Sequence, residues 1–171
     1  MAVAVQLTEW FDPQRVGDSS LRLHAVSDGL PDIALSYQRD RRLFSRTLQL
    51  VIEAQVSGPG PSGDARIAAR ARRLRRRLDL EWVGSLPPGE EGTRDRFVRA
   101  GLSAGARTMT NVRELVVSWS AAEAMWRLRL VTLAGAVIGT APGAAIPVPL
   151  EPDDVNGLLA VLRAFRDAAA N

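Results

Sequence analysis

The stretch RIAARARRLRRRLDLEW, residues 66–82, decides how the fold is built, because it is predicted to supply the first of two helices that cover a sheet. In a helix over about 64–80, with roughly 100° per residue, its apolar side chains fall on one narrow stripe. That stripe consists of Ile67, Ala71, Leu74 and Leu78. We therefore expect an amphipathic helix that packs on the core through the stripe and leaves its arginines beside or opposite it.

This segment also holds the positive charge of the chain. Residues 64–79 contain seven arginines and two aspartates, a net charge of +5, whereas the remaining 15 arginines and 17 acidic residues carry −2. Three interpretations stay open: contact with nucleic-acid phosphates, a solvated face paired with acidic residues elsewhere, and a protein interface. The candidate binding residues are Arg72, Arg73, Arg75, Arg76 and Arg77.

The residues around these arginines argue against specific recognition of nucleic acid. The expected helix has no Asn, Gln, Ser or Thr to read base edges. Aromatic side chains, on which single-stranded bases would stack, are also missing from between the arginines, and Trp82 lies beyond them. Any contact with nucleic acid is therefore expected to involve backbone phosphate.

The composition removes much of the usual catalytic inventory. All 22 basic residues are arginine, there is no cysteine, and His24 is the only histidine. A lysine Schiff base, a thiol nucleophile and a cysteine metal site are therefore excluded, and a conventional histidine triad has little to draw on. The 171 residues are 46% hydrophobic and 24% charged, which is typical of a globular protein. We expect one domain over 1–171, or two strand-then-helix halves, 1–82 and 93–171, joined by the Pro/Gly-rich connector 83–92.

Alternation of apolar and polar residues predicts strands over much of the remaining chain. The expected strands cover 3–7, 21–25, 33–37, 44–56, 115–119, 126–130 and 136–140, with a polar turn at 39–42. A turn over Ser120–Glu123 would set Val117 opposite Trp126 and Leu115 opposite Leu128. The same register would place Glu114 across from Arg129 on the other face, where opposite charges stabilise the pairing.

The C-terminal part of the chain is predicted to end in the second helix. An uncharged segment, 130–150, has nearly the length of a membrane span, but its prolines favour a buried strand and loop instead. Thr93 is a candidate cap for a short helix within 93–104. A helix over 153–169 begins with Pro152 and two aspartates, and its apolar stripe consists of Val155, Leu158, Leu159, Leu162 and Phe165. The predicted class is α+β, with a largely antiparallel sheet of about 6–8 strands in meander hairpins and two main helices.

Two further groups of residues invite a functional interpretation. Trp10 and Phe11 lie together in an expected loop and could anchor a partner, although capping one end of the core explains them as well. The acidic residues Glu151, Asp153 and Asp154 could bind a divalent cation, but the start of a helix accounts for all three. His24 falls on the polar face of its strand, which indicates a surface histidine. Glu90 and Glu91 lie in a Gly/Pro loop and are expected to be solvated or paired with arginine.

These observations predict a non-enzymatic, cytoplasmic protein-interaction module that is oligomeric or part of a complex. No signal peptide is recognisable in the first residues, MAVAVQLTEW. The alternative is a protein that binds nucleic-acid phosphates, or another polyanion, through the arginine-rich segment 66–77. An enzyme that uses carboxylates on a small substrate is a third possibility. We expect no metal, no cofactor and no membrane partner.

Overall fold

The computed structural model describes residues 2–16, 20–42, 45–74, 77–109, 112–140 and 144–171; several side chains within these ranges, including those of 70–74 and 77–82, lie outside the description. The described residues form four helices and nine strands. In chain order these are α1 (Ala2–Gln6), β1 (Phe11–Val16), β2 (Ser20–Ala25), β3 (Ile33–Arg42), β4 (Ser45–Ser57), β5 (Ala65–Leu74), β6 (Arg77–Ser85), α2 (Glu91–Arg99), α3 (Leu102–Thr108), β7 (Val112–Ser120), β8 (Met125–Thr140), β9 (Ala144–Pro147) and α4 (Pro152–Ala170).

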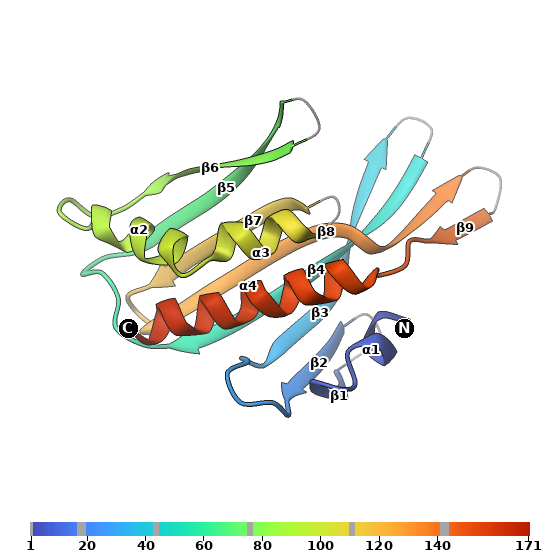
Figure 1. Cartoon of the computed structure of the whole chain (residues 1–171), viewed down its shortest axis with the longest axis horizontal. Helices are drawn as coiled ribbons and strands as arrows, with labels where there is room; N and C mark the ends of the chain where they lie inside the picture. Colours follow the sequence, from blue (N-terminus) through green and yellow to red (C-terminus); the bar gives the residue numbers. More distant parts are fainter. Residues whose placement is uncertain (1, 17–19, 43–44, 75–76, 110–111, 141–143) are drawn as a thin grey trace.

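All nine strands join one antiparallel sheet, so the predicted α+β class is confirmed (Figure 1). The strand order is β1-β2-β3-β4-β8-β7-β5-β6, and β9 pairs with β8. The first four strands follow one another as a meander, after which the chain crosses from β4 to β5. The later hairpin β7–β8 then fills the place between those two strands. The two halves of the sequence therefore contribute neighbouring strands to one sheet.

Two tryptophans fix the connection that crosses from β4 to β5. The indole Nε1 of Trp119 donates to the carbonyl of Pro61 at 3.0 Å, and that of Trp126 donates to the carbonyl of Pro59 at 2.9 Å. Residues 58–64, which form this connection, contain no helix or strand, and Gly60 lies directly against the Trp119 ring. Both indoles are buried, so these bonds satisfy donors that burial would otherwise leave unpaired.

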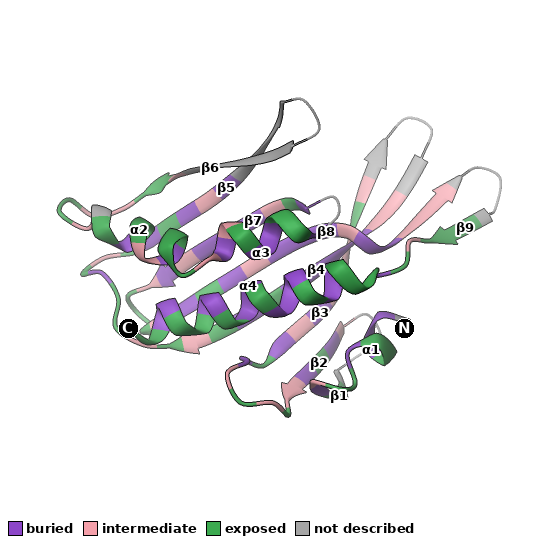
Figure 2. Cartoon of the chain, viewed as in Figure 1, coloured by how far each residue is buried: buried purple, intermediate pink, exposed green. Residues whose placement is uncertain are grey.

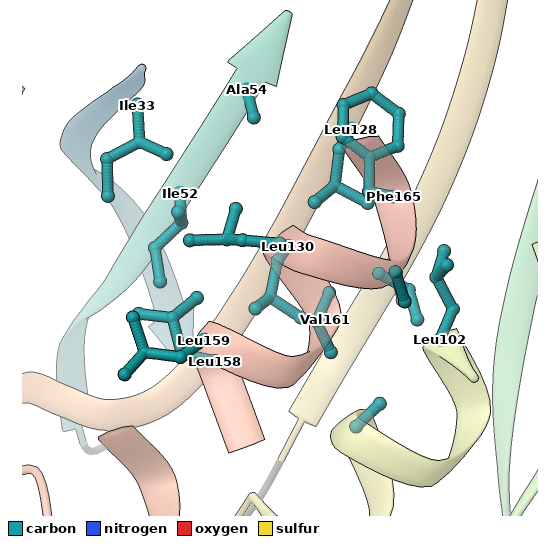
Figure 3. Close-up of a cluster of buried hydrophobic side chains, with 14 of the residues drawn as sticks. Ile33, Ile52, Ala54, Leu102, Leu128, Leu130, Leu158, Leu159, Val161 and Phe165 are labelled. Carbon is teal, nitrogen blue, oxygen red and sulfur yellow. The ribbon is translucent and has the colours of Figure 1, made fainter. Parts of the chain in front are cut away.

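Helices α2, α3 and α4 cover one face of the sheet (Figure 1). Helix α4 runs along the middle of the sheet with buried and exposed residues alternating around it (Figure 2). Its apolar side packs toward side chains of β4 and β8, including Ile52, Leu128 and Leu130 (Figure 3). The predicted helix and its stripe are confirmed, since all five of its members are buried: Val155, Leu158, Leu159, Leu162 and Phe165.

The arginine-rich segment forms a β-hairpin, so the predicted helix over 64–80 is wrong. Strands β5 and β6 pair in antiparallel fashion from Arg66 opposite Ser85 to Leu74 opposite Arg77. Strand β5 also pairs with β7, and its buried side chains Ala65, Ile67 and Ala69 alternate with the exposed Arg66. Pairing with β7 gives β5 ladder bonds and a core-facing side, and this tertiary gain overrides the helix propensity of Ala, Arg and Leu.

The first residues form a short helix in place of the predicted strand 3–7. In α1 and the turn after it, Val3, Ala4 and Leu7 are buried while Val5 is 71% exposed, which is the spacing of a helix face. Residues 39–42, predicted as a turn, continue strand β3. Within 93–104, the expected short helix exists as α2, but Glu90 is its N-cap residue and Thr93 lies inside it.

The hairpin β7–β8 is confirmed, but its register differs by two residues from the predicted one. Val117 lies opposite Leu128 and Trp119 opposite Trp126, so the loop has four residues, 121–124. The predicted register needed a two-residue turn at Ala121-Ala122. Such turns require positive φ at one or both central residues, which alanine disfavours. The longer loop concentrates the strain in Ala124, with φ of 48°.

The described part of the uncharged segment 130–150 lies mostly in strands, as predicted, but its predicted burial holds only for the first half, since residues 145–147 are exposed. Strand β8 runs on to Thr140, longer than the expected strand 136–140, and β9 returns alongside it. The pairing with β4 shifts between Leu48 and Leu50, where Gly135, with φ of +78°, occupies the irregular part of β8. Among the helices of the described residues, none is long and apolar enough to cross a membrane.

Candidate binding surface on the open sheet face

The face of the sheet opposite the helices carries polar side chains in register across its strands. One row of directly paired residues begins at Arg22 on β2, passes Ala34 and Glu53, and reaches Arg129 on β8. It continues through Val116 of β7 to Ala68 of β5. A second row comprises Gln55, Arg127, Ser118 and Arg66. We call the surface formed by these two rows the open face.

Two adjoining hollows make the open face concave. One, of about 350 Å³, lies over β2, β3 and β4 and includes Arg22, Asp32, Ser57 and Met125 in its lining. The other, of about 320 Å³, lies over β4, β8, β7 and β5. Glu53 and Gln55 line both hollows, so the two form one trough that crosses the strands.

Arg129 is the most constrained side chain of the trough. Its Nη1 donates to Glu114 Oε2 at 2.8 Å, its Nη2 donates to Gln38 Oε1 at 2.6 Å, and its Nε lies 3.6 Å from Glu53 Oε1. The Gln38 amide in turn donates to Gln49, at 2.9 Å. Two charge-assisted hydrogen bonds and one ion-pair contact, each from a different nitrogen of one guanidinium, hold it in a single orientation. The middle of the trough is therefore preorganised.

An apolar patch lies beneath this network. Val51, Val116 and Val131 are buried although the helices cover the other face of the sheet, and they lie outside the main hydrophobic core. Val131 lies opposite both Val51 and Glu114, while Val116 lies opposite Arg129. Long polar side chains next to these valines exclude water from them.

The remaining cations of the trough differ in how far they are neutralised. Arg127 forms an ion pair with Glu123, four residues before it. Arg66 is exposed and has no ion-pair partner among the residues whose side chains are described. The trough therefore offers acceptors at Glu53 and Gln55 and a free cation at Arg66, which is a surface of mixed charge.

His24 and Asp32 lie at the edge of this surface, as the polar-face prediction for His24 implies. His24 Nδ1 lies 2.9 Å from Asp32 Oδ2, and its Nε2 lies 3.0 Å from Gln14 Oε1. Burial acts to raise the pKa of Asp32, but the N–H of Ala25 and the neighbouring His24 and Arg22 outweigh it and lower that pKa. Both ring nitrogens of His24 are thus occupied by side chains of the protein, which suits a structural role.

The arginines singled out in the sequence do not form the expected helical surface. Arg72, Arg73 and Arg77 belong to strands, and their side chains lie outside the description. Arg75 and Arg76 lie outside the described residues altogether. The register places Arg70 opposite Glu81 and Arg72 opposite Asp79. Phosphate binding by this segment stays a prediction.

The aromatic pair at the N-terminus is divided by the fold. Phe11 begins β1 and is only 1% exposed, so its side chain belongs to the core. Trp10 is partly buried and packs against the same core. The alternative in which these residues cap the core agrees with this placement, and only Trp10 retains surface that a partner could contact.

The acidic residues at the start of α4 have a structural role. Glu151 and Asp154 form a capping box, in which the Asp154 carboxylate accepts from the Glu151 N–H at 3.2 Å. Asp153 lies in the same first turn, where the helix dipole favours negative charge. In the part of the chain that the structure describes, no three His, Asp or Glu side chains are grouped to hold a metal ion.

Sequence reasoning missed most of the trough. Its residues come from six strands, and their adjacency depends on β7–β8 lying between β4 and β5. The one signal that could be read was the pair Glu114 and Arg129. These residues do bond, although diagonally, since Val131 lies directly opposite Glu114.

The fold and this surface define an α+β protein with one antiparallel sheet, helices on one face and a polar trough on the other. Comparison with protein-family models, curated proteins and solved structures finds no match to the chain.

Proposed function

We propose that the chain is a non-enzymatic, cytoplasmic module that binds another protein chain, or a second copy of itself, through the trough on the open face. The observation that supports this most is the rigid arrangement around Arg129, where three side chains fix one guanidinium above a dry apolar patch. Preorganised charged groups around an apolar centre are typical of surfaces that recognise proteins.

The character of the trough fits a protein better than a small molecule. Small-molecule sites are enclosed and mostly apolar, with a few polar groups. Here charged and amide side chains line both hollows, and Glu53, Gln55, Arg66 and Arg127 are all exposed. A partner of mixed charge would pair with Glu53 and Arg66 from opposite sides of the trough.

The chemistry of the lining favours binding over catalysis. Its hydroxyl groups belong to Ser57 and Ser118, and the Ser57 hydroxyl donates to Met125 Sδ at 3.7 Å. The carboxylates Glu53 and Glu114 both contact the guanidinium of Arg129, Glu114 at 2.8 Å and Glu53 at 3.6 Å, so both belong to the network that orients this cation.

A photo-crosslinking residue at Gln55 tests the proposal, with the same residue at Asn156, on the exposed side of α4, as the control. In cells that express the chain, we expect one discrete adduct from position 55 and none from position 156. Substitution of Arg66→Glu in the same chain should abolish the adduct by reversing the free cation. The proposal fails if the two positions give the same products, or if Arg66→Glu leaves the adduct unchanged.

Light scattering coupled to size-exclusion chromatography separates self-association from binding to another protein. If the partner is a second copy, the purified chain is a dimer at low salt that dissociates at high salt, and Glu53→Arg shifts it to monomer. Glu9→Arg, at an exposed residue before β1, is the matched control and should leave the dimer intact. A dimer equally affected by both variants would contradict assembly through the trough.

A further inference from the structure

A second candidate site lies away from the trough, where α2 meets the C-terminal end of α4. Arg96 of α2 rests on a cluster of buried aromatic rings. Its guanidinium carbon lies 5.4 Å from the centroid of Phe97 and 5.3 Å from that of Trp126. These two rings pack edge to face with centroids 4.8 Å apart, so the platform under Arg96 is fixed.

Arg96 is also incompletely satisfied. Its Nε is buried and has no hydrogen-bond partner, the only such side-chain nitrogen or oxygen among the described residues. Desolvation lowers the pKa of Arg96, and the charge of Glu90 only partly opposes this, yet an arginine stays charged at neutral pH. Buried polar groups are nearly always paired in proteins, so the unpaired Nε leaves this guanidinium with less hydrogen bonding from the chain than a buried charged group normally has.

Space for a further acceptor lies beside Arg96. A hollow of about 330 Å³ between the two helices is lined by Arg96, Arg99, Ala100, Asp167, Ala168 and Asn171. Arg99 lies one turn after Arg96, and its Nε donates to the Asp95 carbonyl at 3.3 Å, which leaves its terminal nitrogens for other acceptors. No described side chain forms an ion pair with either Arg96 or Arg99.

We infer that this hollow binds an oxyanion, a carboxylate or phosphate group, held between the guanidinium groups of Arg96 and Arg99. Planar guanidinium groups bind such anions through paired N–H donors, and stacking on aromatic rings orients them beforehand. Asp167 lines the same hollow and repels excess negative charge. A singly charged carboxylate therefore binds more tightly than doubly charged phosphate.

The test is an NMR titration of the arginine Nε–H signals with sodium acetate and, separately, with inorganic phosphate, against sodium chloride at constant ionic strength. We expect saturable shifts for Arg96 and Arg99, with acetate tighter than phosphate, and none for Arg107, an exposed arginine of α3. Asp167→Asn should reverse the order of affinity, so that phosphate binds more tightly than acetate. The order measured for the wild-type chain shows whether the hollow prefers a carboxylate or a phosphate group.

Two variants decide whether the anion is held by these arginines. Arg96→Gln and Arg99→Gln should each weaken acetate binding about 10-fold or more, since a bond to a charged group contributes about 1.5–3 kcal/mol. Arg107→Gln should leave it unchanged. Should Arg96→Gln fail to fold, the wild-type titration and Arg99→Gln carry the test alone. Shifts that do not saturate, or that chloride reproduces, would overturn the inference.

Discussion

The hairpin β5–β6 makes a sharp prediction at Gly84, which lies opposite Ile67 in the ladder. A Cβ at Gly84 would lie 2.8 Å from Ile67 Cα and closer still to the Arg66 carbonyl oxygen, whereas real Cβ atoms stay beyond 3.0 Å. Both obstacles are backbone, so they cannot turn aside. Gly84→Ala must therefore push β6 away from β5 by about 1 Å, which weakens the neighbouring ladder bonds.

The size of the effect follows from these contacts. Overpacking against a rigid neighbour costs about 1–3 kcal/mol, and one weakened ladder bond adds about 1 kcal/mol. We expect the free energy of unfolding to fall by roughly 2–4 kcal/mol, and the melting temperature by about 4–16 °C for a chain of this size. Because β6 is an edge strand, part of the loss should show as local opening.

Urea unfolding with melting curves measures the global effect, and amide hydrogen exchange of residues 66–69 measures the local opening. Gly92→Ala in α2 is the matched control, since a Cβ there meets nothing within 4 Å, and its stability should stay the same or rise by up to about 1 kcal/mol. A Gly84→Ala protein within about 0.5 kcal/mol of wild type would refute the strand pairing. That result would instead suit a connector at 83–92, as the sequence suggested.

Two further predictions concern the helices and the edge of the sheet. Gly157→Ala should destabilise the protein despite the better helix propensity of alanine, because its Cβ would lie 2.6 Å from Met109 Cγ and 2.8 Å from the Gly105 carbonyl oxygen; unfolding in urea, compared with Gly92→Ala, gives the sign. The lowered pKa of Asp32 means that its contribution to stability is full above the ordinary value of 3.8 and is lost as the pH falls through the lower folded value. The melting temperature should therefore fall more steeply from about pH 5 to pH 2 for wild type than for Asp32→Asn. The same pH dependence in both proteins would contradict this role.

Most strands could be predicted because apolar and polar residues alternate within each of them and so indicate which face is buried. The run 44–56 places apolar residues at every second position, and β4 buries Leu50, Ile52 and Ala54 on the core face. The C-terminal helix could also be predicted, since its apolar stripe and its acidic first turn indicate the same range of residues.

The arginine-rich segment could not be predicted because two periods coincide in it. Ile67, Ala71 and Leu74 suit a helix face, while Ala65, Ile67 and Ala69 suit one face of a strand. The strand is favoured over the helix because β5 pairs with β7, which lies about 50 residues later in the chain. This tertiary contact cannot be read from the local sequence. The trough depends on the same distant pairing, which is why only Glu114 and Arg129 pointed to it.

The interleaved strand order has a consequence for biosynthesis. As the chain leaves the ribosome, β4 and β5 are made long before β7 and β8, which must enter between them. Until then the nascent chain holds two unsatisfied strand edges, and neither half is expected to be stable alone. Charged side chains along a strand, such as Arg66 on β5, disfavour edge-to-edge pairing between such chains. The positive charge of the arginine-rich segment, which first suggested a ligand site, would then protect the incompletely synthesised chain from aggregation.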